Sequence, residues 1–137
     1  MTPHSPDDAT RDGGPAVSAV EGLLALARSR PRWAVSAALG DASEAIARSR
    51  ALAGRSPGRY TPLLARCLRT TAELQLERGR GLEALPLAQE AVALTRALGG
   101  GDLVVSLICL ARAQEAVRRY GEAAATYAEA EKLATAD

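Results

Sequence analysis

Apolar residues recur at every third or fourth position over most of the chain. In the stretch that starts at Pro15, for example, Val17, Val20, Leu24 and Ala27 fall on one face of a helix. Glycine and proline interrupt this spacing at intervals and mark turns. The pattern predicts six helices, over residues 15–30, 32–53, 62–78, 82–98, 103–119 and 122–134. Because the turns between them are short, consecutive helices are expected to be antiparallel neighbours.

Local signals place the boundaries of these helices. Pro31 suits the first turn of the second helix, and Gly54 ends it before the loop-like segment "GRSPGRYTP". Thr61 is the expected N-cap of the third helix, and Asp102 that of the fifth. Residues 1–14 are rich in Pro, Asp, Gly and Thr, and they are predicted to form a disordered tail. The helical domain is then expected to cover residues 15–137.

Three of the predicted helices repeat one another. "ALGDASEAIARSRAL", which starts at Ala38, matches "ALPLAQEAVALTRAL", which starts at Ala84, at nine of fifteen positions and a shift of 46 residues. At a further shift of 39, Ala123, Tyr127 and Ala130 align with Ala84, Ala88 and Ala91. Small residues at this spacing form a stripe along one helix face, where a neighbouring helix can approach closely. The preceding helices also repeat at a shift of 39, where Leu68, Ala72 and Gln75 align with Leu107, Ala111 and Gln114.

A second register is possible for the first of these repeated helices. "DASE", residues 41–44, is a capping box preceded by Gly40, and a helix start there would give a uniform spacing of 39 residues. The nine identities favour one long helix over residues 32–53 instead. Pro86 occupies the place of Gly40 in the matching helix, so this position tolerates a weak helix former.

Composition supports an all-α fold. Apolar residues make up 47% of the chain, but aromatic residues only 3%, and there is no Phe. Such a core of Ala and Leu favours closely packed helices, since strands prefer β-branched and aromatic residues. Trp33 is expected to lie in the core or to pack between the first two helices, the alternative being an anchor for a binding partner.

The net charge and the cysteine content limit which partners and which cellular compartment are expected. The formal net charge of +1 provides no field that favours nucleic acid, and no stretch approaches the ~18 apolar residues of a membrane span. Cys67 and Cys109 lie inside apolar helical patterns and are predicted to be buried thiols. We therefore expect a cytoplasmic protein that binds neither nucleic acid nor a membrane.

No group of residues indicates a catalytic or cofactor site. His4 is the sole histidine and lies in the predicted tail, so Cys and Ser nucleophiles have no histidine base. Two cysteines and one histidine in the tail cannot form a closed zinc site. The segments "GRG" and "GGG" lie between helices and lack the strand and the Lys-Ser/Thr of a phosphate loop. The sequence predicts a non-catalytic protein without cofactor or metal.

The last repeat resembles the tetratricopeptide (TPR) family. "YGEAAATYAEAEKLA", which starts at Tyr120, is similar to the second helix of that motif, and Leu107, Leu110 and Ala111 match the first. Gln114 stands where the family usually has Tyr, and the spacing is similar to that of the longer repeats of actinobacterial TPR proteins. The resemblance implies a right-handed helical-hairpin solenoid of about three TPR-like repeats. It also implies an adaptor or regulatory scaffold that binds a protein or peptide in a groove lined by the first helix of each pair.

On this register, six residues are candidate partner contacts: Arg66, Arg69, Glu73, Ile108, Arg112 and Glu115. Arg59 can approach Arg66 and Arg69 from the preceding loop, and clustered arginines bind carboxylates in bidentate fashion. The alternative is a solvated face with pairs such as Arg69–Glu73, four residues apart on one helix.

The last predicted helix suggests a second function, that of a subunit which associates with itself. Ala124, Ala128 and Leu133 lie outside its inward stripe. Val104, Leu107 and Leu110 on the preceding helix are expected to share this apolar surface. An uncovered apolar edge tends to pair with a copy of itself or with another chain. We therefore expect a homodimer through the last repeat, the alternative being a monomer that tolerates an Ala-rich surface.

Overall fold

The computed structural model describes the backbone of residues 6–136 and the side chains of residues 14–136. Within this range the protein is all-helical and contains no strand. The helices are α1 (Pro6–Ser29), α2 (Val35–Arg55), α3 (Pro57–Glu77), α4 (Gly81–Arg96), α5 (Gly100–Ala116) and α6 (Tyr120–Ala134). The predicted number and order of helices are therefore confirmed for the described residues.

Several predicted helix starts differ from the structure. Helix α5 begins at Gly100, so Asp102 lies in its first turn and is not its N-cap. Helix α2 begins at Val35, after the turn that contains Pro31.

The largest differences are at α1 and α3. Helix α1 begins at Pro6, so residues 6–14 of the expected tail belong to it, whereas residues 1–5 lie outside the described part of the chain. Helix α3 begins at Pro57, with only Ser56 separating it from α2, so the expected loop and the Thr61 cap are wrong. A proline suits the first turn of a helix because no amide donor is needed there. Pro62 is also accommodated inside α3.

Helix α2 runs unbroken through Gly40. This confirms the single long helix and excludes the start at the capping box of residues 41–44. One exposed glycine in a helix costs about 1 kcal/mol relative to alanine, which the packing along the rest of α2 outweighs.

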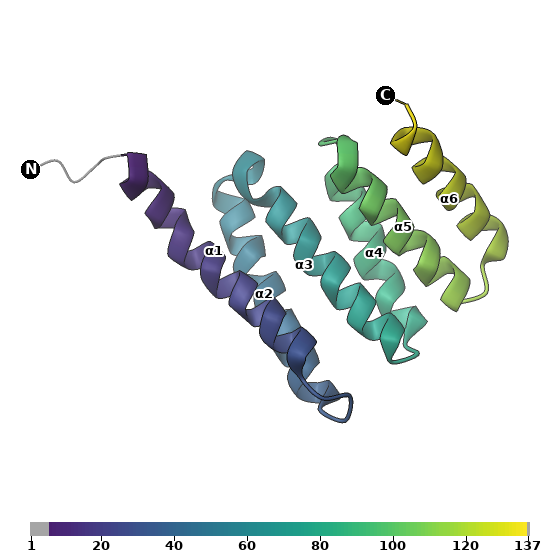
Figure 1. Cartoon of the computed structure of the whole chain (residues 1–137), viewed down its shortest axis with the longest axis horizontal. Coiled ribbons are helices and arrows are strands. Elements are labelled where there is room, and N and C mark those ends of the chain that lie inside the picture. The colour runs from purple at the N-terminus through teal and green to yellow at the C-terminus, as the bar shows by residue number, and fades with distance from the viewer. Residues whose placement is uncertain (1–5, 137) are drawn as a thin grey trace, which may run out of the picture.

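The six helices form a row in which each packs against the next one in the chain (Figure 1). Helix α3 also contacts α1 and α5, so the odd-numbered helices form a layer of their own. In Figure 1 this layer faces the viewer, and α2 and α4 lie behind it. Helices α1 and α6 lie at opposite ends of the row.

The repeated alanine stripes lie at the contacts between helices. Each of the stripe alanines is at most 3% exposed: Ala38, Ala42 and Ala45 in α2, Ala84, Ala88 and Ala91 in α4, and Ala123 and Ala130 in α6. A methyl side chain lets neighbouring helices approach closely. Larger aliphatic side chains, mostly of the odd-numbered helices, complete the core, with Val20, Leu68 and Leu107 fully buried.

Ion pairs join successive even-numbered helices in a repeated manner. Arg50 of α2 contacts Glu90 of α4 at 2.6 Å, and Arg96 of α4 contacts Glu129 of α6 at 2.6 Å. Arg50 and Arg96 occupy equivalent positions of the sequence repeat, and so do Glu90 and Glu129. The hydrogen bond from Arg96 lowers the pKa of Glu129. Such exposed pairs contribute little to stability, but they link helices whose backbones do not touch.

Two aromatic side chains, Trp33 and Tyr60, lie in other places than the sequence predicts. Trp33 is 86% exposed in the turn between α1 and α2, so its predicted packing between these helices is wrong. Tyr60, expected in a loop, lies in the first turns of α3 and is buried in the same cluster as Val20 and Leu24. The early start of α3 brings Tyr60 into the core.

We predict that Ala91→Phe destabilises the fold by roughly 1–3 kcal/mol, because the larger ring overpacks the contact that the buried methyl group now fills. Ala93→Phe on the exposed face of α4 is the matched control and should change stability little. Urea unfolding followed by circular dichroism measures both. Equal stability of the two variants would contradict the role assigned to the stripe.

Candidate functional site

A hollow of about 570 Å³ opens between α1 and α3 and reaches the start of α5. Its apolar wall includes Val17 of α1 and Leu63 of α3, and three arginines of α3 reach it. These arginines are Arg59, Arg66 and Arg69. They lie on one side of α3 because positions 59, 66 and 69 are separated by seven and three residues.

Among the residues whose side chains are described, two of the three arginines have only exposed contacts. Arg66 donates to the carboxylate of Glu21 on α1 at 3.1 Å, and both side chains are about half exposed. The guanidinium carbon of Arg59 lies 5.3 Å from the centre of the Tyr60 ring. Exposed pairs of this kind contribute about 0–1 kcal/mol, so a ligand carboxylate can replace Glu21 at Arg66 at small cost.

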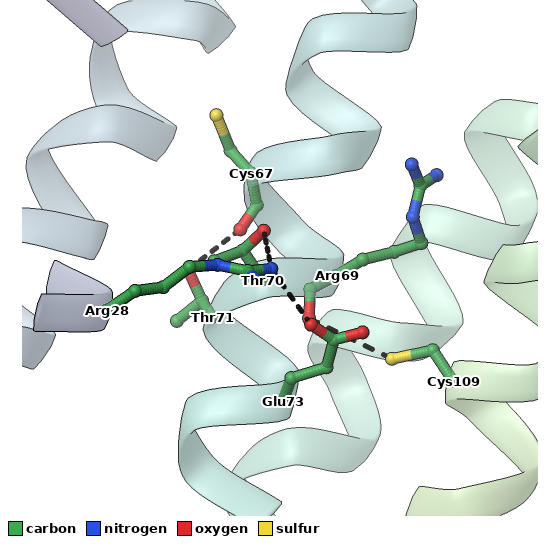
Figure 2. A network of polar contacts seen from close by, with 7 residues as sticks. All are labelled: Arg28, Cys67, Arg69, Thr70, Thr71, Glu73 and Cys109. Carbon is green, nitrogen blue, oxygen red and sulfur yellow. Dashed lines mark hydrogen bonds and ion pairs between the residues drawn. The ribbon is translucent and has the colours of Figure 1, made fainter. Parts of the chain in front are cut away.

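Arg69 has a different role, because its side chain is only 14% exposed. Its guanidinium donates to the Ser106 hydroxyl of α5 at 3.0 Å and lies 3.9 Å from the Asp102 carboxylate. The Cys109 thiol in turn donates a weak bond to the Arg69 carbonyl at 3.9 Å, as Figure 2 shows. Arg69 thus connects α3 with α5 at the side of the hollow.

Glu73 belongs to a neighbouring polar network (Figure 2). Arg28 of α1 donates to the Glu73 carboxylate at 3.2 Å and to the Thr70 hydroxyl at 3.3 Å. The alternative pairing of Glu73 with Arg69 on the same helix is therefore wrong. Sequence reasoning missed Arg28, because the first repeat unit is degenerate and did not reveal which face of α1 meets α3.

The candidates on α5 lie elsewhere. Ile108 lines a second groove, of about 520 Å³, between α5 and α6. Glu115 accepts a hydrogen bond from the Tyr127 hydroxyl at 2.8 Å, and burial, assisted by this bond, raises the pKa of Tyr127. Arg112 is exposed and lines neither cavity. The six predicted contacts are thus divided between the hollow, the Arg28–Glu73 network and the α5–α6 pair.

Both cysteines are buried, as predicted. Burial, together with the nearby Glu73 carboxylate, raises the pKa of Cys109 to about 11, and burial also raises the pKa of Cys67. Neither thiol is substantially ionised near neutral pH, so neither has the character of a reactive nucleophile.

Two further observations apply to the described residues. No helix among them combines the length and apolar character needed to cross a membrane. They also contain no cluster of three or more His, Cys, Asp or Glu side chains placed to bind a metal ion.

Comparison with known proteins gave no match to a family model, to a curated protein or to a solved structure. The arrangement of the site residues is therefore the basis for the function proposed below.

We predict that both cysteines of the folded protein resist a thiol reagent at about pH 8, and that both react once urea unfolds the chain. The Cys109 thiol has a folded pKa of about 11 against an ordinary value of 9.0, so its contribution to stability is present below pH 9.0 and is lost as the pH rises toward 11. Mass spectrometry of the alkylated protein counts the modified thiols. Modification of the folded chain at the rate of a free thiol would contradict this packing.

Proposed function

We propose that the protein is a non-catalytic, tetratricopeptide-like scaffold that binds an acidic segment of a partner protein at the hollow between α1 and α3. On this proposal the three helical hairpins stack as a right-handed solenoid, and the layer of α1, α3 and α5 is its binding face. The repeated alanine stripes and the packing of helices in adjacent pairs support this arrangement. Two buried thiols fit a reducing, cytoplasmic location.

The observation that carries the proposal is the convergence of Arg59, Arg66 and Arg69 on a hollow with an apolar wall. An arginine fork binds a carboxylate through two parallel hydrogen bonds, and an apolar wall accepts an aliphatic side chain of the same ligand. The wall is formed by residues such as Val17 and Leu63. A peptide with an acidic residue next to an aliphatic residue matches both features.

The three arginines contribute in different ways. Arg66 and Arg59 can turn toward a ligand, because the contact that each makes with a described side chain is exposed. Arg69 keeps its bond to Ser106 and adds positive charge to the edge of the hollow. Asp102 lies at the same edge and partly opposes that charge, so we expect acidic groups to bind near Arg59 and Arg66.

We predict that the double variant Arg59→Glu with Arg66→Glu weakens the binding of acidic peptides at least tenfold, since each lost charge-assisted bond costs roughly 1.5–3 kcal/mol. The probes are fluorescent peptides that pair Glu or Asp with Leu or Val, and the same peptides with Lys in place of the acidic residues. Fluorescence anisotropy measures the affinity. Binding of the acidic set should also weaken as salt is added, because the contacts are exposed.

The matched control is Arg119→Glu with Arg55→Glu, which makes the same change in net charge at exposed positions outside the hollow. It should bind the acidic peptides like the wild type. Equal loss in both double variants would show a nonspecific charge effect. Preference for the Lys peptides would contradict the proposed ligand class.

A further inference from the structure

The groove between α5 and α6 has the composition of a contact between helices. It is lined by Val104 and Ile108 of α5 and by Ala124, Tyr127, Ala128, Ala130, Glu131 and Ala134 of α6. Ile108 is 40% exposed, although it is a large apolar side chain. The prediction that Val104 belongs to the apolar surface of the last repeat is confirmed. Leu107 is instead buried in the core, and Leu110 packs against the core partly buried.

The chain itself shows what covers the equivalent surface one repeat earlier. A shift of 39 residues places Ile108 on Arg69 of α3, and Ala124 and Tyr127 on Leu85 and Ala88 of α4. In that earlier repeat, helix α5 covers the surface. Leu85 and Ala88 form one core cluster with residues of α5, and Arg69 contacts Ser106 of α5. The groove between α5 and α6 is therefore shaped for another helix of the α5 kind.

Each odd-numbered helix carries a stripe at a spacing of four, three and four residues. On α5 this stripe is Asp102, Ser106, Cys109 and Ala113, and it faces α3 and α4. On α3 it is Leu63, Cys67, Thr70 and Leu74, and it faces α1 and α2. Helices α1 and α3 end at Ser29 and Glu77, and this shift of 48 residues places the α3 stripe on Pro15, Ala19, Gly22 and Leu26 of α1.

The stripe on α1 is uncharged and open to solvent. Pro15, Gly22 and Leu26 are exposed, Leu26 at 43%, and Ala19 is partly buried. Helix α1 is the first of the row, so no described helix lies against this side (Figure 1). Among the described helices, one end of the row therefore presents an α5-like stripe that no helix covers, and the other presents a groove for such a stripe.

The α1 stripe and the α5–α6 groove differ from the internal contact that α5 makes with α3 and α4, and their differences complement each other. Inside the chain, Arg69 meets the Ser106 hydroxyl, whereas at the ends the equivalent positions are Ile108 and Ala19, both apolar. Inside the chain, the large Leu85 shares a cluster with the small Ala113. At the ends these sizes are exchanged. The groove has the small Ala124 at the position equivalent to Leu85, and the α1 stripe has the large Leu26 at the position equivalent to Ala113. Polarity and volume are thus complementary between the groove and the α1 stripe.

From this complementarity we propose that copies of the protein associate head to tail, with α1 of one copy in the α5–α6 groove of the next. The contact joins different surfaces, so it leaves one groove and one stripe free at the ends of every assembly. It replaces the pairing of two last repeats that the sequence suggested. It also leaves Arg59 and Arg66 uninvolved, so it is independent of the proposed peptide site.

The contact is expected to be weaker than the packing inside the chain. Arg50 and Arg96 form the ion pairs between successive even-numbered helices, and Thr135 occupies the next equivalent position. Glu44, the counterpart of Glu90 and Glu129, pairs with Arg48 on its own helix. No ion pair of this series therefore extends across the two copies.

Sedimentation velocity on the full chain at rising concentration tests the association. We expect the average mass to rise from the 14.2 kDa of one chain to twice that value and beyond. Leu26→Glu and Ile108→Glu each place a charge in the contact, so each variant alone should remain at the mass of one chain. Both side chains are exposed, so neither change should alter the melting temperature. Leu82→Glu, an exposed position outside both surfaces, is the control and should associate like the wild type.

A mixture of the two variants distinguishes this contact from a twofold one. The Ile108→Glu chain keeps its stripe and the Leu26→Glu chain keeps its groove, so an equimolar mixture should form a species of two chains and none larger. A chain that stays monomeric at every concentration overturns the proposal. So does a dimer that Leu26→Glu leaves intact, which is the result expected of a twofold pairing through the last repeats.

Cross-linking tests the register. A mixture of Ala19→Cys and Ile108→Cys chains should form an intermolecular disulfide, since the proposed packing places these positions opposite each other. Ala25→Cys lies on another face of α1 and is the control. Equal cross-linking of the Ala19→Cys and Ala25→Cys chains to Ile108→Cys would overturn the register.

Discussion

Close approach of helices at the alanine stripes is the contact on which the rest of this structure depends. An alanine buries little area, so no single stripe residue stabilises the fold by much. What the stripes provide is space. Because Ala84, Ala88 and Ala91 are so small, helix α4 can pack against both α3 and α5, and the aliphatic side chains of those helices can fill the core between them. The spacing of the row follows from this packing.

Polar contacts then join helices that are not consecutive in the chain. The Arg50–Glu90 and Arg96–Glu129 pairs reach between even-numbered helices whose backbones do not touch, and Arg69 reaches from α3 to Ser106. Arginine suits this task because its long stem spans the gap and its planar head forms two bonds. The same property makes Arg59 and Arg66 suitable for a ligand, since a long side chain at the edge of a hollow can exchange one carboxylate for another.

Partner binding and association between copies, as proposed, use different parts of the row. The hollow lies on the side of α3 that faces α1, whereas the groove and the α1 stripe lie at the two ends. Differences between equivalent positions of the repeat explain why the two proposed functions use different surfaces. Arg69 and Ile108 occupy equivalent positions, yet Arg69 has a polar partner on the next helix and Ile108 has none among the described residues. A repeat thus adapts one position to an internal contact in one unit and to an external contact in another.

The sequence by itself determined the helical class, the six helices, the unbroken α2 and the burial of the alanine stripes, because these follow from the spacing of side chains along one helix. Local spacing cannot show which exposed face meets another element. The exposure of Trp33, the pairing of Glu73 with Arg28 and the division of the candidate site residues between separate places were therefore decided only by the tertiary structure. The start of α3 at Pro57 belongs with them, since a Gly- and Pro-rich segment reads as a loop until packing of Tyr60 against the core favours a helix.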